Sequence, residues 1–246
     1  MTYCVGIKLD AGIVMMSDTR TNAGLDNISR FRKMFTWEIE GERMLACCCS
    51  GNLSITQGVL SRINARIAQS ADDSSIETIL NAPTMFRAAQ LIGDAMTEVQ
   101  ARHRESLQSQ GAGPDASILL AGQRRGGEAR LYLIYSAGNF IEATADTPFL
   151  QIGEHKYGKP ILDRVITPET PLEQALKAVF LSMDSTLRSN LSVGMPLDLV
   201  VMDSNAFRFS IQRRIERDDE VFSAISKGWA DAIRDAFSTL PSVNHH

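Results

Sequence analysis

The sequence has no long hydrophobic run, no excess of basic residues and no Walker-type glycine-rich loop. Its apolar runs are too short to cross a bilayer, and its N-terminus does not have the charged and apolar regions of a signal peptide. A formal net charge of −4 is unfavourable for nucleic acid or an anionic membrane as the main partner. We therefore expect a cytoplasmic protein that uses no metal or organic cofactor, no nucleic acid and no membrane.

Cysteine is scarce and unevenly placed. The four cysteines are Cys4 and the consecutive Cys47, Cys48 and Cys49. Neighbouring residues of a strand point to opposite faces, so a consecutive run forms disulfides poorly. The spaced Cys-x-x-Cys pairs that would converge on one metal ion are also absent. We expect these cysteines to be buried strand residues.

No repeat, low-complexity block or Pro/Gly/Ser-rich linker divides the chain. A chain of 246 residues with 44% apolar residues can bury a substantial core. We therefore predict a single domain spanning residues 1–246.

Hydrophobic periodicity predicts the elements of the first half of the chain. Alternating or apolar runs predict strands, and a 3.6-residue period predicts helices. A Ser/Thr-x-x-Glu capping box predicts one further helix start. The expected elements are strands at 4–9, 12–16, 34–39 and 43–49, a helix over 55–67, a second helix from 74–77 that ends before Pro83, and a longer helix through Leu91, Met96 and Val99.

The second half returns to strands separated by glycine turns. Thr170-Pro171-Leu172-Glu173 predicts a helix start with threonine at N-cap, proline at N1 and glutamate at N3. The expected elements are strands at 116–122, 129–136 and 140–145, a helix from 170 towards 188, strands at 197–202 and 207–211, a solvated turn over the charged run 212–220, and a helix over 218–237.

The order of these elements favours two antiparallel sheets packed face to face, with helices outside both. An α+β protein with one sheet covered by helices has a similar pattern. Periodicity alone leaves both architectures open.

Thr2 is the strongest candidate for chemistry. After removal of Met1 it would carry a hydroxyl nucleophile and a free α-amine that can act as its base. Lys33 could lower the pKa of that amine, and Asp18 could hold the lysine in place. Gly51, at a predicted strand-to-helix junction, could offer a backbone N–H to an oxyanion. These residue types at this spacing predict an amide hydrolase.

Each of these residues also has a simpler interpretation. Some residue must follow every initiator methionine, so the position of Thr2 alone proves nothing. Asp18 could cap the turn from Ser17 to Arg20, and Lys33 could be a solvated charge at a strand edge. Neither alternative explains the joint spacing of the two residues from Thr2.

The first seventy residues resemble a proteasome β-type subunit. The resemblance rests on Thr2 with its following strand, on Ser17-Asp18-Thr19-Arg20, on Lys33 and on Cys49-Ser50-Gly51 before a helix. The segment 19–24 with Phe31-Arg32-Lys33 is more similar to the bacterial proteasome-related Anbu group than to the HslV peptidase. The resemblance implies a four-layer αββα sandwich, the N-terminal nucleophile hydrolase fold, with a threonine nucleophile and ring-like homo-oligomers.

Later motifs depart from the family pattern. Where the family has a Gly-Ser-Gly element, this chain has Gly153-Glu154, so Glu154 stands in place of the serine. Where the family has an aspartate three residues before a Ser-Gly element, Ser192 remains but the aspartate is Ser189, unless a shifted register brings in Asp184. The resemblance further suggests that Cys49 and Leu53 line the pocket for the side chain before the scissile bond.

Three hypotheses follow from these residues. The first is a threonine peptidase that acts on peptides or unfolded proteins and assembles from identical subunits. The second is a weakly active or inactive proteasome-like scaffold, which the departures at Glu154 and Ser189 favour. The third is an N-terminal nucleophile amidase on small amides. Any ATP-driven unfoldase would be a separate chain.

Overall fold

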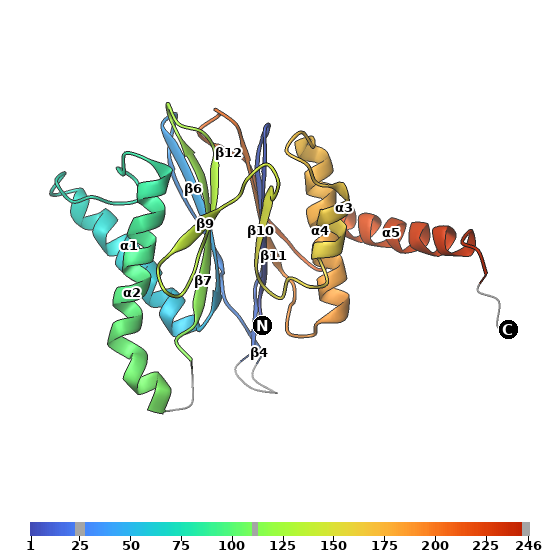
Figure 1. Cartoon of the computed structure of the whole chain (residues 1–246), viewed down its shortest axis with the longest axis horizontal. Helices are drawn as coiled ribbons and strands as arrows, with labels where there is room; N and C mark the ends of the chain where they lie inside the picture. Colours follow the sequence, from blue (N-terminus) through green and yellow to red (C-terminus); the bar gives the residue numbers. More distant parts are fainter. Residues whose placement is uncertain (23–27, 110–112, 243–246) are drawn as a thin grey trace.

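Two five-stranded antiparallel sheets pack face to face at the centre of the molecule (Figure 1). The computed structural model describes residues 1–22, 28–109 and 113–242. One sheet contains, in spatial order, β10 (Phe149–Gly153), β1 (Tyr3–Leu9), β2 (Gly12–Asp18), β11 (Leu197–Asp203) and β12 (Phe209–Ile215). The other contains β5 (Met34–Ile39), β6 (Arg43–Gly51), β7 (Ala116–Arg124), β8 (Arg130–Ile134) and β9 (Phe140–Glu142). The short strands β3 (Arg20–Asn22) and β4 (Ile28–Arg30) pair with each other.

Helices cover the outer faces of both sheets (Figure 1). The helices α1 (Leu53–Ser70) and α2 (Met85–Ser109) lie on the sheet that contains β6 and β7. The helices α3 (Lys159–Val165) and α4 (Leu172–Ser189) lie on the sheet that contains β1 and β2. The last helix, α5 (Glu220–Ser238), leaves the α4 layer and projects away from the body. The predicted four-layer αββα sandwich is confirmed, and the single-sheet alternative is wrong.

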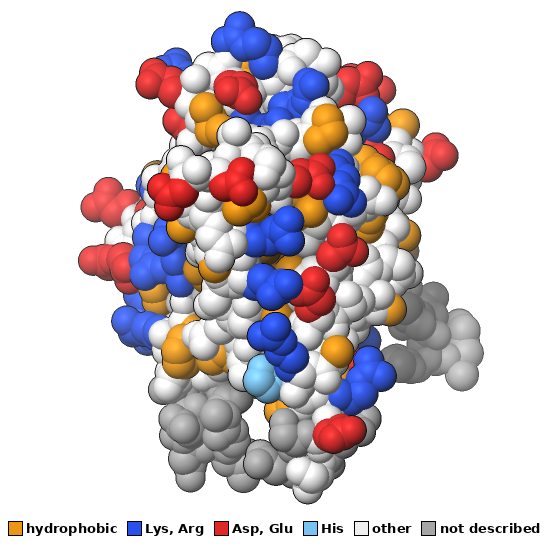
Figure 2. Space-filling view, turned by 90° about the vertical axis from the view of Figure 1, so that its left-hand side faces the viewer, with side chains coloured by type: hydrophobic (Ala, Val, Ile, Leu, Met, Phe, Trp, Pro, Cys, Tyr) orange, Lys and Arg blue, Asp and Glu red, His pale blue; other side chains and the backbone are white. Residues whose placement is uncertain are grey.

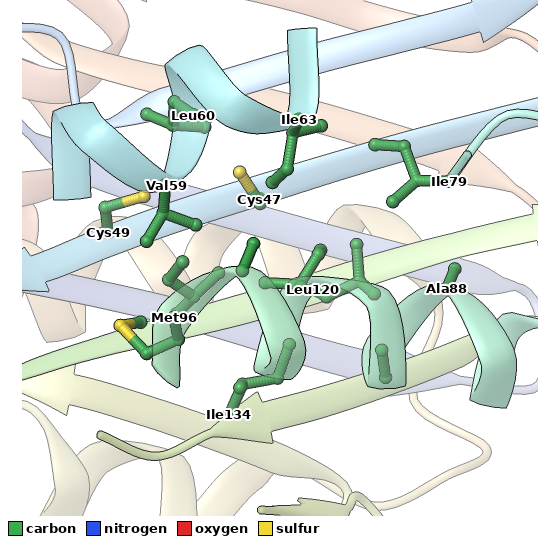
Figure 3. Close-up of a cluster of buried hydrophobic side chains, with 14 of the residues drawn as sticks. Cys47, Cys49, Val59, Leu60, Ile63, Ile79, Ala88, Met96, Leu120 and Ile134 are labelled. Carbon is green, nitrogen blue, oxygen red and sulfur yellow. The ribbon is translucent and has the colours of Figure 1, made fainter. Parts of the chain in front are cut away.

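Alternation along the strands creates the apolar layers of this sandwich. Cys47 faces the helices, where it joins Val59 of α1 and Met96 of α2 (Figure 3). Cys48 faces the opposite way, into the layer between the sheets, where it joins Met15 of β2. All four cysteines are buried and free, as the sequence predicts. Burying one large apolar side chain contributes about 1.5–3 kcal/mol, so these layers dominate the stability of the sandwich.

The capping box at 74–77 does not begin a helix. Residues 71–84 form turns, and α2 begins only at Met85. The Glu77 carboxylate accepts hydrogen bonds from Arg87, and the Asn81 side chain accepts from the Thr78 N–H at 2.6 Å. Arg43 donates two hydrogen bonds to carbonyl groups in this segment. These side-chain contacts satisfy the backbone without a helix, which is how polar residues compete with helix formation.

Other boundaries also differ from the sequence prediction. The elements β3, β4, β10 and α3 were not predicted, and β9 ends at Glu142 instead of residue 145. Pro171, not Thr170, is the N-cap of α4, because the Thr170 hydroxyl accepts a hydrogen bond from the Thr167 N–H. The last hairpin is shifted: Phe207 lies in the turn with φ of 51°, and β12 takes up part of the charged run.

The outer face of the α1–α2 layer is polar. Figure 2 shows lysine and arginine side chains mixed with aspartate and glutamate across this face, with apolar side chains scattered between them. Such a mixed surface is typical of a solvated face. None of the helices in the described residues is long and apolar enough to span a membrane.

Candidate active site

Thr2 lies directly before β1 and packs tightly against the end of β10. Its residue is 9% exposed, and its carbonyl oxygen accepts a hydrogen bond of 2.6 Å from the Glu154 N–H. A Cβ on Gly153 would lie 2.0 Å from the same oxygen, and Gly153 has a φ of +80°. Only glycine allows the β10 backbone to approach this closely. The backbone around Thr2 is therefore fixed from the side of β10.

Asp18 and Lys33 form a buried ion pair. The Lys33 Nζ lies 2.7 Å from Asp18 Oδ1, and the side chains are 6% and 0% exposed. Asp18 ends β2, whereas Lys33 lies directly before β5, so the pair joins the two sheets. The interpretation of Lys33 as a solvated edge charge is wrong.

Backbone groups complete the environment of the Asp18 carboxylate. Oδ1 accepts from the Tyr3 N–H at 3.1 Å, and Oδ2 accepts from the N–H groups of Arg20 at 3.1 Å and Gly194 at 3.2 Å. Asp18 therefore holds Lys33 and also fixes the turn to Arg20, so the two interpretations from the sequence are compatible. Burial raises the pKa of the Asp18 carboxyl, while Lys33 and the N–H groups of Tyr3 and Gly194 oppose this shift.

Lys33 also donates hydrogen bonds to two backbone carbonyl groups, those of Arg20 and Met1. Its Nζ donates to the Arg20 carbonyl at 2.5 Å and to the Met1 carbonyl at 3.5 Å. The second contact places the ammonium beside the peptide group that joins Met1 to Thr2. The Thr2 nitrogen belongs to this peptide group, so the positive charge of Lys33 is close to it.

Gly51 ends β6 in a conformation that other residues rarely adopt. Its φ is +100°, and a Cβ would lie 2.3 Å from the Asp115 carbonyl oxygen. The next residue, Asn52, is the N-cap of α1, because its side chain accepts hydrogen bonds from Ser54 and Ile55. The N-terminus of α1 therefore begins beside Gly51, and its partial positive charge favours an anion there.

A cavity of about 330 Å³ opens beside Thr2. Thr2, Lys33 and Gly51 share this cavity, and so do both predicted pocket residues, Cys49 and Leu53. The sequence did not indicate the remaining lining, because it comes from several separate segments, namely β3, the start of β5 with the segment before it, the end of β6 and the first turns of α1. These further residues are Thr21, Arg32, Phe35, Ser50, Thr56, Gln57 and Leu60, with Met1 and Gly153 at the N-terminal side.

A larger groove of about 560 Å³ runs along β5 and β12. Four arginines line it, and Arg214 is paired there with Asp198 at 2.8 Å. Thr2, Asp18 and Lys33 do not line this groove. We therefore take the smaller cavity as the candidate active site, because Thr2 and Lys33 line it.

Glu154 extends from Thr2 towards the end of α4. Its Oε2 accepts a hydrogen bond of 3.1 Å from the Asn190 side chain, and Asn190 Oδ1 accepts from the Ser192 N–H at 2.9 Å. Asn190 is a site residue that the sequence analysis missed, since an asparagine after a helix usually only caps it. Glu154 and Ser192 are therefore brought together, through Asn190.

Ser189 and Asp184 are not part of this arrangement. Ser189 is exposed at the end of α4, and among the described residues no hydrogen bond connects its side chain with Thr2, Asp18 or Lys33. Asp184 instead accepts from Arg188 at 2.9 Å and from Ser226 of α5 at 2.8 Å. The shifted register that would bring Asp184 to the site is wrong.

The segment after α4 is tied to the turn that carries Asp18. Besides the bond from Gly194 to Asp18, the Thr19 N–H donates to the Gly194 carbonyl at 3.3 Å, and Arg20 Nη1 donates to the Leu191 carbonyl at 2.6 Å. These contacts use backbone groups of residues 191–194. Sequence reasoning could not assign them, because a backbone group carries no residue-specific signal.

Met1 occupies the entrance of the site. Its residue is 61% exposed, and its peptide bond to Thr2 leaves Thr2 without a free amine in this chain. Burial, followed by the charge of Lys33, lowers the pKa of the Met1 α-amine, while Asp18 opposes this. The protonation equilibrium of the Met1 α-amine is thus shifted towards the neutral form.

The described residues contain no group of three or more His, Cys, Asp or Glu side chains that could hold a metal ion. The groups that meet at the site are the Thr2 residue, the Asp18–Lys33 pair and backbone donors. A hydroxyl with a cation beside its own backbone nitrogen is an arrangement that nucleophilic acyl transfer can use once that nitrogen is a free amine.

Comparison with known proteins gives a consistent result. None of the curated proteins compared with the chain matches it. The family model described as "Proteasome subunit" matches residues 2–202.

Solved structures of Anbu proteins superpose on nearly the whole chain. Anbu (ancestral beta-subunit) from Yersinia bercovieri has a TM-score of 0.91 at 43% identity, covering 99% of each chain. An Anbu (Gly-1) mutant from Hyphomicrobium sp. strain MC1 has a TM-score of 0.90 at 45% identity, covering 100% of each. The Anbu complex from Pseudomonas aeruginosa, described as a helical assembly, has a TM-score of 0.92 at 45% identity, covering 98% of each. The chain belongs to the proteasome family, as a β-type, Anbu-like member.

Proposed function

We propose that this chain is an N-terminal threonine hydrolase that cleaves amide bonds of peptides or unfolded proteins after Met1 has been removed. The observation that carries the proposal is the buried Asp18–Lys33 pair, whose ammonium lies beside the peptide group of Thr2. Burying an ion pair is costly unless further hydrogen bonds satisfy it. The Asp18 carboxylate has four donors, from Lys33 and from the N–H groups of Tyr3, Arg20 and Gly194, which meets that requirement beside the expected nucleophile.

The α-amine of Thr2 acts as the base in this mechanism. An α-amine ordinarily has a pKa of about 7.7–8.0, and the burial and the Lys33 charge that lower the pKa of the Met1 amine act on a freed Thr2 amine as well. The neutral amine accepts the proton of the Thr2 hydroxyl, directly or through one water. The hydroxyl oxygen then attacks the carbonyl carbon of the substrate.

The tetrahedral intermediate carries a negative charge on oxygen. The Gly51 backbone and the N-terminus of α1 beside it are placed to stabilise that charge. Collapse of the intermediate releases the amine of the substrate, which takes up the proton from the Thr2 ammonium. Water then hydrolyses the remaining ester and regenerates Thr2.

The cavity beside Thr2 suggests the preferred side chain of the substrate. Its apolar lining includes Phe35, Cys49, Leu53 and Leu60, and its charged side chains are Arg32 and Lys33. A volume of about 330 Å³ accommodates a large side chain. We propose that uncharged apolar side chains before the scissile bond bind here and that basic ones are excluded.

We further propose that the chain works in the cytoplasm as an assembly of identical subunits. The Pseudomonas aeruginosa relative, at 45% identity, is described as a helical assembly. Enclosing the site within an assembly would keep folded proteins from reaching it. The proposal includes no metal, nucleic acid or membrane.

Turnover of a peptide library by the native chain and by two variants tests the proposal. Thr2→Ala should lose all turnover above background, whereas Thr2→Ser keeps both hydroxyl and amine and should retain part of it. The intact mass of each sample must first show that Met1 has been removed. Turnover that is unchanged in Thr2→Ala would rule out the assigned nucleophile.

A second candidate function rests on Glu154. The backbone N–H of Glu154 donates to the Thr2 carbonyl, and the Glu154 carboxylate is held by Asn190; the resemblance to the family expects a serine at this position. A negative charge close to the freed amine would favour its protonated form and leave less of the neutral amine available as the base. Met1 removal without turnover across varied peptides would therefore favour an inactive, proteasome-like scaffold, and turnover of small amides alone would favour an amidase.

A further inference from the structure

The groove along β5 and β12 lies between the edges of the two sheets. Each of these strands is the outermost strand of its sheet. Two contacts join them: Gln212 donates to the Thr36 hydroxyl at 3.0 Å, and the Phe209 N–H donates to Glu38 at 3.1 Å. Because residue 212 meets residue 36 and residue 209 meets residue 38, the two strands run in opposite directions. The end of β12 therefore lies towards the start of β5.

Arginines gather at this end of the groove. Two of them come from the segment before β5 and two from the second half of β12, and all four are exposed. They are Arg30, Arg32, Arg213 and Arg214. The antiparallel course of the two strands thus brings together cations that are far apart in the sequence.

Few carboxylates offset this positive charge. Among the described residues that line the groove, Asp198 is the one acidic side chain, and it pairs with Arg214. Arg213 lies 3.4 Å from Asp219, which is outside the lining. No ion pair among the described residues involves Arg30 or Arg32. The groove therefore has positive charge available for an anionic ligand.

The groove adjoins the candidate active site. Arg32 lines both the groove and the cavity that contains Thr2. Phe31 and Met34, on either side of the Arg32–Lys33 pair in the sequence, add apolar lining. The edge of a sheet presents unpaired backbone groups, and an extended polypeptide can pair with them as an added strand. A polypeptide held at Thr2 can thus continue into the groove, where successive carboxylates would meet several arginines.

We propose that this groove binds an acidic stretch of the polypeptide substrate. The stretch lies on one side of the apolar residue that enters the cavity beside Thr2, and its carboxylates pair with Arg30, Arg32 and Arg213. A guanidinium group binds a carboxylate through two parallel hydrogen bonds, which gives such contacts strength and direction. The inference rests on the proposed function and narrows its substrate class to segments in which an apolar residue neighbours several acidic ones.

Peptide binding to the Thr2→Ala chain tests the groove without requiring turnover. The probes are fluorescein-labelled peptides that contain one leucine and three glutamates, with the glutamates either all before or all after the leucine. Matched peptides carry glutamine in place of glutamate. Fluorescence anisotropy measures each Kd, after the intact mass has shown that Met1 is absent.

Two double variants of this chain carry the same change of charge. Arg30→Gln/Arg213→Gln alters the groove but leaves Arg32, because Arg32 also lines the cavity beside Thr2. Arg102→Gln/Arg104→Gln is the control, since both arginines are exposed on α2 and do not line the groove. Circular dichroism and urea midpoints check that both variants are folded.

One of the two glutamate peptides should bind about tenfold more tightly than its glutamine match. Single exposed ion pairs contribute little, but several charge-assisted contacts in one groove act together. The groove variant should lose most of this preference, and the control variant should keep it. Added salt should weaken the preference, because exposed charges are screened.

Several results would overturn the inference. Glutamate and glutamine peptides could bind equally. Equal gains for the two glutamate peptides, or equal losses in the two arginine variants, would indicate a general attraction of anions. Displacement of the peptide by inorganic phosphate, but not by sodium chloride of the same ionic strength, would assign the groove to phosphate. A groove variant that changes the assembled mass in analytical ultracentrifugation and leaves peptide binding intact would assign it to a contact between copies.

Turnover separates this inference from the proposed function. A preference for glutamate in the Thr2→Ala chain without turnover by the native chain would support the groove and contradict the hydrolase. Turnover of leucine peptides at the same kcat/KM with and without glutamates, together with equal binding, would support the hydrolase and contradict the groove.

Discussion

Replacing Lys33 by methionine tests the buried ion pair on which the candidate site depends. The substitution keeps the length of the side chain but leaves Asp18 without its cation. Removing one partner of a buried pair costs about 3–5 kcal/mol, because the other charge remains uncompensated. Three backbone N–H groups still serve Asp18, so we expect the lower end, about 3 kcal/mol at pH 7. Urea unfolding at one fixed protomer concentration measures this loss.

The loss should depend on pH in a defined direction. Burial already raises the pKa of the Asp18 carboxyl in the folded chain, and Lys33 opposes that rise. Without Lys33 the folded-state pKa rises further above its unfolded value. A carboxyl with a raised folded pKa contributes most to stability at low pH, and this contribution is lost as the pH rises through the folded pKa. The difference between native chain and variant should therefore be largest near neutral pH and shrink towards the ordinary Asp value of 3.8.

Lys159→Met is the matched control. Lys159 pairs with Asp163 at 2.6 Å, but both side chains are about half exposed, at 49% and 47%. Exposed pairs contribute about 0.2–1 kcal/mol, so this variant should lose little stability. A double-mutant cycle with Asp18→Asn should give a coupling of about 2–3 kcal/mol for the buried pair. Equal losses in the two lysine variants, or a loss at Lys33 that grows as the pH falls, would refute the reasoning.

Three further predictions follow from the site and its surroundings. Gly51→Ala should destabilise the chain by at least about 1–3 kcal/mol, because its φ is +100° and its Cβ would meet the Asp115 carbonyl. At Gly228 no atom of the described residues lies within 4 Å of an added Cβ, so Gly228→Ala should stabilise α5 by about 0.5–1 kcal/mol. Equal urea midpoints for the two variants would contradict the geometry. Glu154→Gln should move the acid limb of the kcat/KM profile of peptide turnover to lower pH, because a lost negative charge lowers the pKa of the Thr2 amine; a shift to higher pH would exclude this effect. Burial raises the pKa of the Cys48 thiol well above its ordinary value, so this thiol should react with a disulfide reagent only in denaturant, and rapid labelling of the native chain would contradict its burial.

Much of the sandwich could be predicted, because its signals are local and repeated. Alternating apolar residues identify β5 with its observed bounds, and the 3.6-residue period identifies α1. The helix start predicted at 74–77 was wrong, because a capping box reflects only interactions within one helix turn and contains no information about groups from distant parts of the chain. Here Arg43 and Arg87, both from other elements, supply the competing hydrogen bonds.

Some parts of the candidate site could be predicted from the sequence and others could not. Side chains with a chemical role, such as those of Asp18 and Lys33, could be proposed from type and spacing, and the fold brings them together. The donors from Tyr3 and Gly194 to Asp18 are backbone groups, and any residue other than proline supplies one. Asn190 could not be found because its role depends on the position of Glu154, which a single sequence does not show.

The chain segment from Asp184 to Gly194 touches two places at once. At one end, Asp184 and Arg188 hold the base of α5, and at the other, Gly194 donates to the carboxylate beside Thr2. The segment therefore connects the base of α5 directly with the candidate site. Thermodynamic linkage then requires reciprocity: if a contact on α5 changes the affinity of the site for substrate, substrate changes the strength of that contact by the same factor.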